Sequence, residues 1–308
     1  ELHIPKDALY KGKPRSRIAY LCASKRMDWE PVAWTEFDGK NIVFTDIQKG
    51  PVMRVATYER GRLRFWTDPF EINVSNEFHF FTPSDSVQDV TLFAKYTLRA
   101  DEMFLNRMIG GTFEGSNDPD FREKEVLYLI NEKPKRLQTV VQSYSSKPYR
   151  YVRYIGPKDS HCNIAEAAFY TPNDTASLKG KVIGTPGCFQ KDGSHEYTNV
   201  FDGDITTSFD YVEPSGGWSG LDLGTPKQIG RIVYTPRSYD NYIRSGDKYE
   251  LFYCDQQDKW ESLGKQISNA DSLIYKNIPV NVLLLLRNNS RGIQERIFTY
   301  ETRRQIWK

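Results

Sequence analysis

The feature that most constrains the fold is the spacing of short apolar or alternating runs along the chain. Four of them lie in the first hundred residues, at 17–21, 41–44, 52–56 and 77–81. Segments rich in Gly, Pro, Asp and Glu separate these runs and have the chemistry of turns. Short runs at intervals of about ten residues, without a long segment of period 3.6, are typical of antiparallel sandwiches. We therefore predict an all-β protein made of tandem β-sandwiches.

The composition agrees with this fold class and excludes others. Hydrophobic residues make up 39% of the chain and charged residues 27%, which supports packed cores and not disorder. Aromatic residues reach 14% and fit strand faces well. The formal net charge of +2 removes the electrostatic case for a dedicated nucleic-acid binder. The longest apolar run, residues 282–286, is only strand-sized, so we expect no transmembrane segment.

At 308 residues, the chain is long enough for two or three domains. The alternation breaks near residue 100, and a polar linker follows at residues 171–174. We predict an N-terminal β-sandwich over 1–100, a partial repeat or intermediate β-sandwich over 101–173, and a jelly roll over 174–308. One short helix is expected, at residues 122–130, where a strand is the alternative.

Two parts of the sequence echo each other. Residues 164–169 and 293–298 both read Ile-x-Glu-x-x-Phe, and each follows an apolar strand and a polar loop. Self-similarity of this kind indicates a repeated structural unit. We interpret the two segments as the closing half of one module, present twice, although two unrelated hairpins would also look alike.

Several segments resemble discoidin (coagulation factor 5/8 type C) domains. They are Val-Phe-Asp-Gly-Asp-Ile-Thr-Thr-Ser-Phe at 200–209, Gly-Trp-Ser-Gly-Leu-Asp-Leu-Gly at 217–224, the strands at 229–237 and 249–251, and the closing strands at 164–170 and 293–300. Their order and spacing across residues 195–301 carry the resemblance. The whole chain also resembles the C-terminal accessory region of large secreted bacterial proteins, transglutaminase-like or glycan-utilising, although no residue here supplies the transglutaminase triad.

The resemblance implies a galactose-binding-like jelly roll with ligand loops at one end. It further implies binding to glycans, extracellular matrix or lipid headgroups, without turnover, and a secreted, periplasmic or cell-surface location. The chain begins at Glu1 without an apolar leader, so we expect a mature product or an excised piece, with a possible catalytic domain upstream in the full-length protein.

A calcium site is predicted around residues 202–207. Calcium takes about six to eight oxygen ligands from carboxylates, carbonyls and hydroxyls. Gly203 allows the sharp turn that aims carbonyl groups inward, and the closing strand brings a carboxylate beside the loop in the related family. The predicted ligands are Phe201, Asp202, Asp204, Thr207 and Glu295. Glu166 matches Glu295 in the repeat, but its own predicted module has no such loop. The alternative is an Asx-turn in which Asp202 caps its own backbone.

A sugar site needs a flat ring for the apolar face of the sugar and planar donors for its hydroxyl groups. The predicted ligand-binding residues are Tyr211, Trp218, Arg237, Tyr239, Tyr242 and Arg244. Alternatively, Trp218 is a core residue that packs between the sheets. For the two arginines, the alternative is to brace loops through buried ion pairs.

The sequence does not favour catalysis. It contains no Gly-x-Ser-x-Gly, no His-Glu-x-x-His and no phosphate-binding Gly-rich loop. His161 and Cys162 are adjacent, but neighbours on a strand point apart, which does not suit a nucleophile and its base. Carboxylate pairs for glycoside hydrolysis stay open, because their spacing is three-dimensional.

The four cysteines, Cys22, Cys162, Cys188 and Cys254, show no Cys-x-x-Cys pair; buried thiols and disulfides are both possible.

We therefore predict a non-catalytic carbohydrate-binding or adhesion module, stabilised by Ca²⁺. The alternative is a structural or protein-interaction region attached to a catalytic domain outside this chain.

Overall fold

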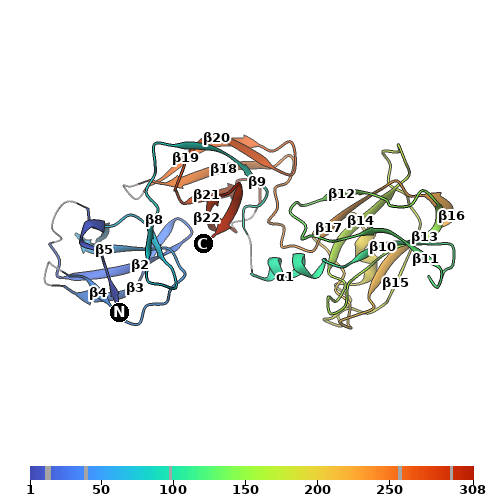
Figure 1. The fold of residues 1–308 in the computed structure, drawn as a ribbon, viewed down its shortest axis with the longest axis horizontal. Helices are drawn as coiled ribbons and strands as arrows, with labels where there is room; N and C mark the ends of the chain where they lie inside the picture. Colours follow the sequence, from blue (N-terminus) through green and yellow to red (C-terminus); the bar gives the residue numbers. More distant parts are fainter. Residues whose placement is uncertain (11–14, 38–40, 97–98, 256–258, 292–293) are drawn as a thin grey trace. The chain divides into compact units, whose positions relative to one another are not determined.

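The computed structural model describes the whole chain except residues 11–14, 38–40, 97–98, 256–258 and 292–293. Antiparallel strands dominate it, which confirms the all-β prediction (Figure 1). In the described part, α1 (Arg99–Arg107) is the one α-helix, beside two short 3-10 helices, η1 (Lys6–Ala8) and η2 (Tyr197–Phe201). No helix among the described residues is long and apolar enough to cross a membrane.

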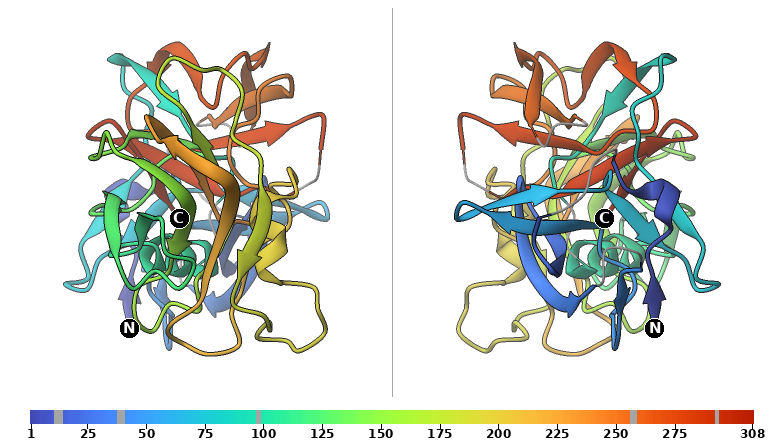
Figure 2. Two further views of the ribbon diagram at one scale, coloured as in Figure 1. Left: turned by 90° about the vertical axis from the view of Figure 1, so that its right-hand side faces the viewer. Right: turned by 90° about the vertical axis from the view of Figure 1, so that its left-hand side faces the viewer.

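The chain forms two compact units, and the second is an insertion into the first. Unit 1 comprises Glu1–Tyr96 and Ile243–Lys308, and unit 2 comprises Thr97–Tyr242. Two pairings close unit 1 around the insertion point. Strand β9 (Val87–Leu92) pairs with β20 (Leu273–Pro279), which lies beside it in Figures 1 and 2. The Ile243 N–H also donates to the Phe93 carbonyl at 3.1 Å.

The N-terminal part of unit 1 is a six-stranded sheet in the order β3-β2-β5-β7-β8, with β6 paired to β5. Its buried face alternates with a more exposed one, so Ala19 and Leu21 are fully buried while Ile18 is not. A two-stranded sheet, β1 with β4, completes this part. The strands are β1 (Leu2–His3), β2 (Ile18–Lys25), β3 (Asp28–Glu36), β4 (Val43–Phe44), β5 (Met53–Glu59), β6 (Arg62–Phe65), β7 (Phe70–Ile72) and β8 (Phe78–Phe80).

The C-terminal part of unit 1 is a five-stranded sheet in the order β19-β18-β21-β22-β23. It packs with β9 and β20 around a core that contains Leu251, Leu286 and Phe298. A further apolar cluster, including Val52 and Leu285, joins the two parts of unit 1. The strands are β18 (Lys248–Cys254), β19 (Trp260–Ile267), β21 (Leu284–Asn288), β22 (Ile297–Glu301) and β23 (Arg304–Trp307).

Unit 2 is a sandwich of a five-stranded sheet, β11-β10-β13-β16-β15, and a three-stranded sheet, β12-β17-β14. Its core draws on both sheets, with Phe113 and Leu221 from the first and Phe169 and Ile232 from the second. The strands are β10 (Thr112–Ser116), β11 (Lys124–Leu129), β12 (Thr139–Gln142), β13 (Pro148–Ile155), β14 (Ile164–Tyr170), β15 (Lys181–Gly184), β16 (Trp218–Gln228) and β17 (Arg231–Pro236).

The units differ from the domains predicted from the sequence. The boundary at 173/174 is wrong, because β13 pairs with β16 and β14 with β17, so both sheets of unit 2 cross it. The predicted jelly roll over 174–308 is instead divided between the units at Tyr242/Ile243. The predicted boundary near 100 lies close to the start of unit 2. The expected helix at 122–130 is strand β11, the stated alternative, and the helix lies at Arg99–Arg107.

Replacing residues 97–242 with a short Gly/Ser linker should leave a folded unit 1, because the hydrogen bond between Phe93 and Ile243 holds the two ends together. Circular dichroism and thermal melting of the shortened protein check this, with residues 97–242 expressed separately as the companion sample. A shortened protein that melts without cooperativity would show that unit 1 depends on the insertion.

Candidate ligand-binding rim of unit 2

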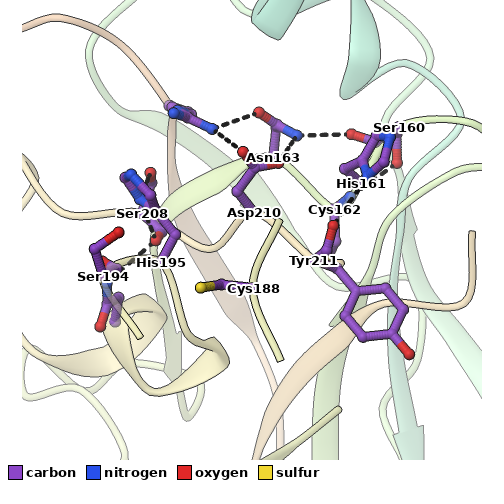
Figure 3. Close-up of polar contacts among 12 residues, drawn as sticks. Ser160, His161, Cys162, Asn163, Cys188, Ser194, His195, Ser208, Asp210 and Tyr211 are labelled. Carbon is purple, nitrogen blue, oxygen red and sulfur yellow. Dashed lines mark hydrogen bonds and ion pairs between the residues drawn. The ribbon is translucent and has the colours of Figure 1, made fainter. Parts of the chain in front are cut away.

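Three loop segments lie side by side at the N-terminal end of β14. The Tyr211 N–H donates to the His161 carbonyl at 2.7 Å, and His161 Nδ1 lies 2.9 Å from the Tyr211 carbonyl oxygen. Isolated bridges add Cys188 opposite Tyr211 and Phe209 opposite Ile164. Figure 3 shows these segments together, with the Tyr211 ring directed away from the polar contacts. We call residues 159–163, 187–192, 208–214 and 236–241 the rim.

A buried polar triad, Asp210, Arg237 and Asn163, joins these loops to the end of β17. Arg237 Nη1 lies 2.7 Å from Asp210 Oδ2 and donates to Asn163 Oδ1 at 3.1 Å. The Asn163 amide donates to Asp210 Oδ1 at 3.0 Å and to the Ser160 carbonyl at 2.8 Å (Figure 3). The side chains of the ion pair are only 13% and 11% exposed. The three side chains therefore hydrogen-bond one another largely out of contact with water. These bonds fix the loops relative to one another.

Aromatic rings surround this triad at the surface. Phe189 is 57% exposed and packs edge-on against His161, with ring centroids 5.1 Å apart. Tyr239 is 47% exposed and lies 6.0 Å from the buried Phe104 ring. The Arg237 guanidinium lies 4.4 Å from the centre of the Phe104 ring, so the triad contacts the ring against which Tyr239 packs. Two exposed rings thus stand on rigid supports.

The rim also contains strained backbone. Asp159, His161 and Cys162 have φ angles of 61°, 55° and 55°, and Asp240 has 61°. Left-handed conformations cost roughly 1–3 kcal/mol for residues other than glycine and cluster at ligand sites. The hydrogen bonds of Asn163 and Tyr211 offset that cost here.

Trp218 and Tyr242 lie outside the rim's exposed surface. Trp218 opens β16, where its half-buried ring packs 5.6 Å from Phe121 and 5.1 Å from the Arg153 guanidinium. It thus packs on the face of the five-stranded sheet that carries Arg153. Tyr242 is 8% exposed and belongs to an apolar cluster with Leu105 and Leu137.

The two predicted arginines belong to different units. Arg244 belongs to unit 1, where its backbone N–H donates to the Tyr249 hydroxyl at 2.9 Å. Arg237 belongs to unit 2 and has the bracing role that was its alternative. Of the six predicted sugar-binding residues, Tyr239 is exposed at the rim, Tyr211 is half-buried in it and Arg237 supports it.

The loop at 202–207 forms as a compact turn. Asp202 Oδ1 accepts the Asp204 N–H at 2.7 Å, and its Oδ2 accepts the Thr207 hydroxyl at 2.8 Å. Gly203 has a φ of +84°, which glycine adopts without strain. Phe201 anchors the loop from η2, where its ring stacks on Phe169. The bond from Asp204 N–H to Asp202 is the Asx-turn considered as the alternative to a metal site.

Glu166, and not Glu295, is the carboxylate beside this loop. Glu166 Oε1 accepts the Gly203 N–H at 2.9 Å. Glu295 lies in unit 1, 3% exposed, and forms ion pairs with Arg26 and Arg287. The prediction of Glu295 as a metal ligand is therefore wrong. The two echoing strands belong to different units, and the loop shares unit 2 with the first of them.

The charged form of the Glu166 side chain is electrostatically unfavourable in this position. Burial, followed by the neighbouring Asp202 carboxylate, raises the pKa of Glu166 to about 8. A cation between the two carboxylates would relieve both effects. Among the described residues, no group of three or more His, Cys, Asp and Glu side chains is placed to hold a metal ion. Backbone carbonyls and the Thr207 hydroxyl would have to supply the other oxygens that calcium requires.

The thiols are buried. All four cysteines are free, and none forms a disulfide. Burial raises the pKa of the Cys162 thiol far above its usual range, so the thiol beside His161 stays protonated.

Sequence reasoning did not name Phe189, Asn163 and Asp210, and it set aside His161 and Glu166. The Ile-x-Glu-x-x-Phe echo had pointed to Glu166. For the other four, nothing in the local sequence marks a shared site, because the segments meet only through long-range pairing.

Comparison with known proteins adds no relative: no protein-family model, curated protein or solved structure matches this chain.

Replacing Asp210 with Ala should destabilise unit 2 by about 3–5 kcal/mol, because the Arg237 charge is left buried without its partner. Urea unfolding of the excised unit or of the whole protein measures this. Asp120→Ala, at a side chain 70% exposed, is the matched control and should change stability by less than about 0.5 kcal/mol. Equal losses for the two variants would mean that the triad does not brace the rim.

Proposed function

We propose that the protein is a non-catalytic carbohydrate-binding or adhesion module that contacts glycans through the rim of unit 2. The observation that carries the proposal is the pair of exposed rings, Phe189 and Tyr239, held on loops that a buried ion pair fixes. Rings fixed in this way lose little conformational freedom when a ligand binds. A flat ring also matches the apolar C–H face of a sugar, as it does at other surfaces that combine stacking with polar contacts.

Polar groups beside the rings suit sugar hydroxyl groups. The His161 imidazole is half-buried at the rim, and the side chains of Gln190, Lys191 and Asp192 beside Phe189 are exposed. Each sugar hydroxyl is both a donor and an acceptor, so such a mixture of groups satisfies it. Among the charged side chains exposed at the rim, Asp159, Asp192 and Glu213 outnumber Lys191, which favours neutral sugars over strongly acidic ones.

Calcium is proposed as a structural cofactor of the loop at 202–207. Glu166 and Asp202 face each other, and burial together with the Asp202 carboxylate raises the pKa of Glu166 to about 8, which a bound cation would reverse. Asp204, Thr207 and the Phe201 carbonyl belong to the same loop and would have to turn towards these two carboxylates to complete the oxygen ligands that a hard divalent cation prefers.

In this proposal, the segments that resemble a discoidin domain occur in a permuted order along the chain. The segments at 200–209, 217–224 and 229–237 all lie in unit 2, and so does the closing strand β14, which comes first in the chain. On that resemblance, we also propose a secreted, periplasmic or cell-surface protein with a catalytic domain upstream.

A structural or protein-interaction role is the second candidate, and one observation favours it. One face of the N-terminal sheet of unit 1 exposes large side chains, with Trp34 at 65% and Tyr58 at 46%. Their neighbour Tyr20 pairs with Trp34 across the strands and packs against the Tyr58 ring. Exposed apolar side chains gathered on one face often mark contact surfaces.

A glycan array should detect binding by the whole protein and lose it in the double variant Phe189→Ala/Tyr239→Ala. Each lost ring should cost about 0.5–1.5 kcal/mol of binding free energy, so the two substitutions together should reduce affinity roughly tenfold or more. Tyr144→Ala, which removes a ring that is 63% exposed elsewhere in unit 2, is the control and should bind normally. Failure of the wild-type protein to bind any glycan would leave the structural role as the better explanation.

Calcium should raise the melting temperature of unit 2 by mass action, and a chelator should reverse the effect. Glu166→Gln should abolish this response while stabilising the chelated protein, because it removes one of two facing carboxylates. Glu295→Gln tests the calcium ligand predicted from the sequence: it should destabilise unit 1 and leave the calcium response intact. A wild-type melting temperature that calcium does not change would rule out the cofactor.

A further inference from the structure

We propose that unit 1 binds an oxyanion group, such as a sulfate, phosphate or carboxylate, in a pocket between the β2–β3 turn and the turn that follows β21. The pocket is lined by Arg26, Arg287, Asn288, Asn289, Ser290, Arg291 and Glu295. This inference goes beyond the proposed function, because it concerns unit 1 alone and uses no residue of the rim.

Three guanidinium groups converge here from separate places in the sequence. Arg26 lies in the turn between β2 and β3 with a φ of 59°, a left-handed conformation that a side chain other than glycine rarely takes. Arg287 belongs to β21, and Arg291 follows three residues after that strand ends. A strained turn that aims a charged side chain at other charges of the same sign needs a compensating interaction.

Buried carboxylates hold the three guanidinium groups in place. Glu295, 3% exposed, lies 3.3 Å from Arg26 Nη2 and accepts from Nη2 of Arg287 at 3.1 Å. Asp247, 6% exposed, accepts from Arg291 Nε at 2.7 Å. These acids lie behind the arginines, whose side chains stay 42%, 36% and 50% exposed. The arrangement is that of three arginines that buried acids hold and that stay partly exposed to solvent.

The charge of the pocket favours an anion. Its lining carries three arginines and one carboxylate, Glu295. Lys95, which is 5% exposed, donates to the Arg291 carbonyl at 3.3 Å and adds positive charge beneath the turn. Asp247 and Glu250 are opposing charges nearby, and Glu250 accepts from Asn289 at 3.3 Å. Since guanidinium forks match the two oxygens of an oxyanion, a bound oxyanion would complete the balance of charge.

The whole protein is titrated with sodium sulfate, sodium phosphate and methyl glucuronide by calorimetry, each against sodium chloride at equal ionic strength. Saturable binding of one of the three is expected, and it should weaken as salt rises. Preference among the probes identifies the source as a sulfate ester, a phosphate or a uronic acid. If none binds saturably above the chloride baseline, the proposal is overturned.

Arg26→Gln should weaken that binding about tenfold, equivalent to about 1.4 kcal/mol, because one of three cations is lost. Arg291→Lys keeps the charge but removes the fork, so it should also weaken binding, and it tests the site if the first variant disturbs folding. Arg62→Gln, at an exposed arginine of β6, is the control and should bind as the wild type does. Unchanged affinity in both pocket variants would contradict the proposal. The Phe189→Ala/Tyr239→Ala variant should bind the anion normally, which separates this site from the glycan rim.

Discussion

The ion pair between Asp210 and Arg237, completed by Asn163, is the interaction on which the rim of unit 2 depends. Its cost is the removal of two charges from water, and this is offset by the short ion pair and by the Asn163 amide, which hydrogen-bonds both Asp210 and Arg237. A pair of apolar residues could fill the same space. It would not fix the direction of three loops, whereas charge-assisted hydrogen bonds do so through their geometry. The backbone strain at His161 and Cys162 persists because this network over-determines the loop.

Because unit 2 is inserted into unit 1, the two units differ in how far apart along the chain their paired strands lie. Unit 2 is continuous in sequence, so its strands pair within one stretch of chain. Unit 1 must bring β9 to β20 across the insertion, a pairing with a large sequence separation. Loop-closure entropy grows slowly with length, so the insertion is thermodynamically tolerable. A folded unit 2 would also shorten the effective loop, since the structure brings Phe93 and Ile243 into hydrogen-bonding distance.

The sequence predicts the features that depend on local patterns. Alternation and turn residues predicted the β fold, and the Asp-Gly-Asp segment predicted the turn at 202–207 that the structure contains. Features that depend on long-range pairing were wrong or missed. Glu295 and Glu166 sit in the same local motif, and only the topology decides which unit holds the loop. The segment at 122–130 fitted a short helix or a strand, and the pairing of β11 with β10 decides for the strand.

The two sites proposed here use charge in opposite ways, and the difference follows from burial. In the rim, the Asp210–Arg237 pair is buried, and the surface offered to a ligand combines exposed rings with separate charges at Asp159, Lys191, Asp192 and Glu213. In the pocket of unit 1, the acids are buried behind Arg26, Arg287 and Arg291, so the outward surface is cationic. The first arrangement gives contacts that salt barely affects, while the second gives contacts that salt screens. Binding at the rim and binding in the pocket of unit 1 would therefore be physically independent, and ionic strength would affect the second more than the first.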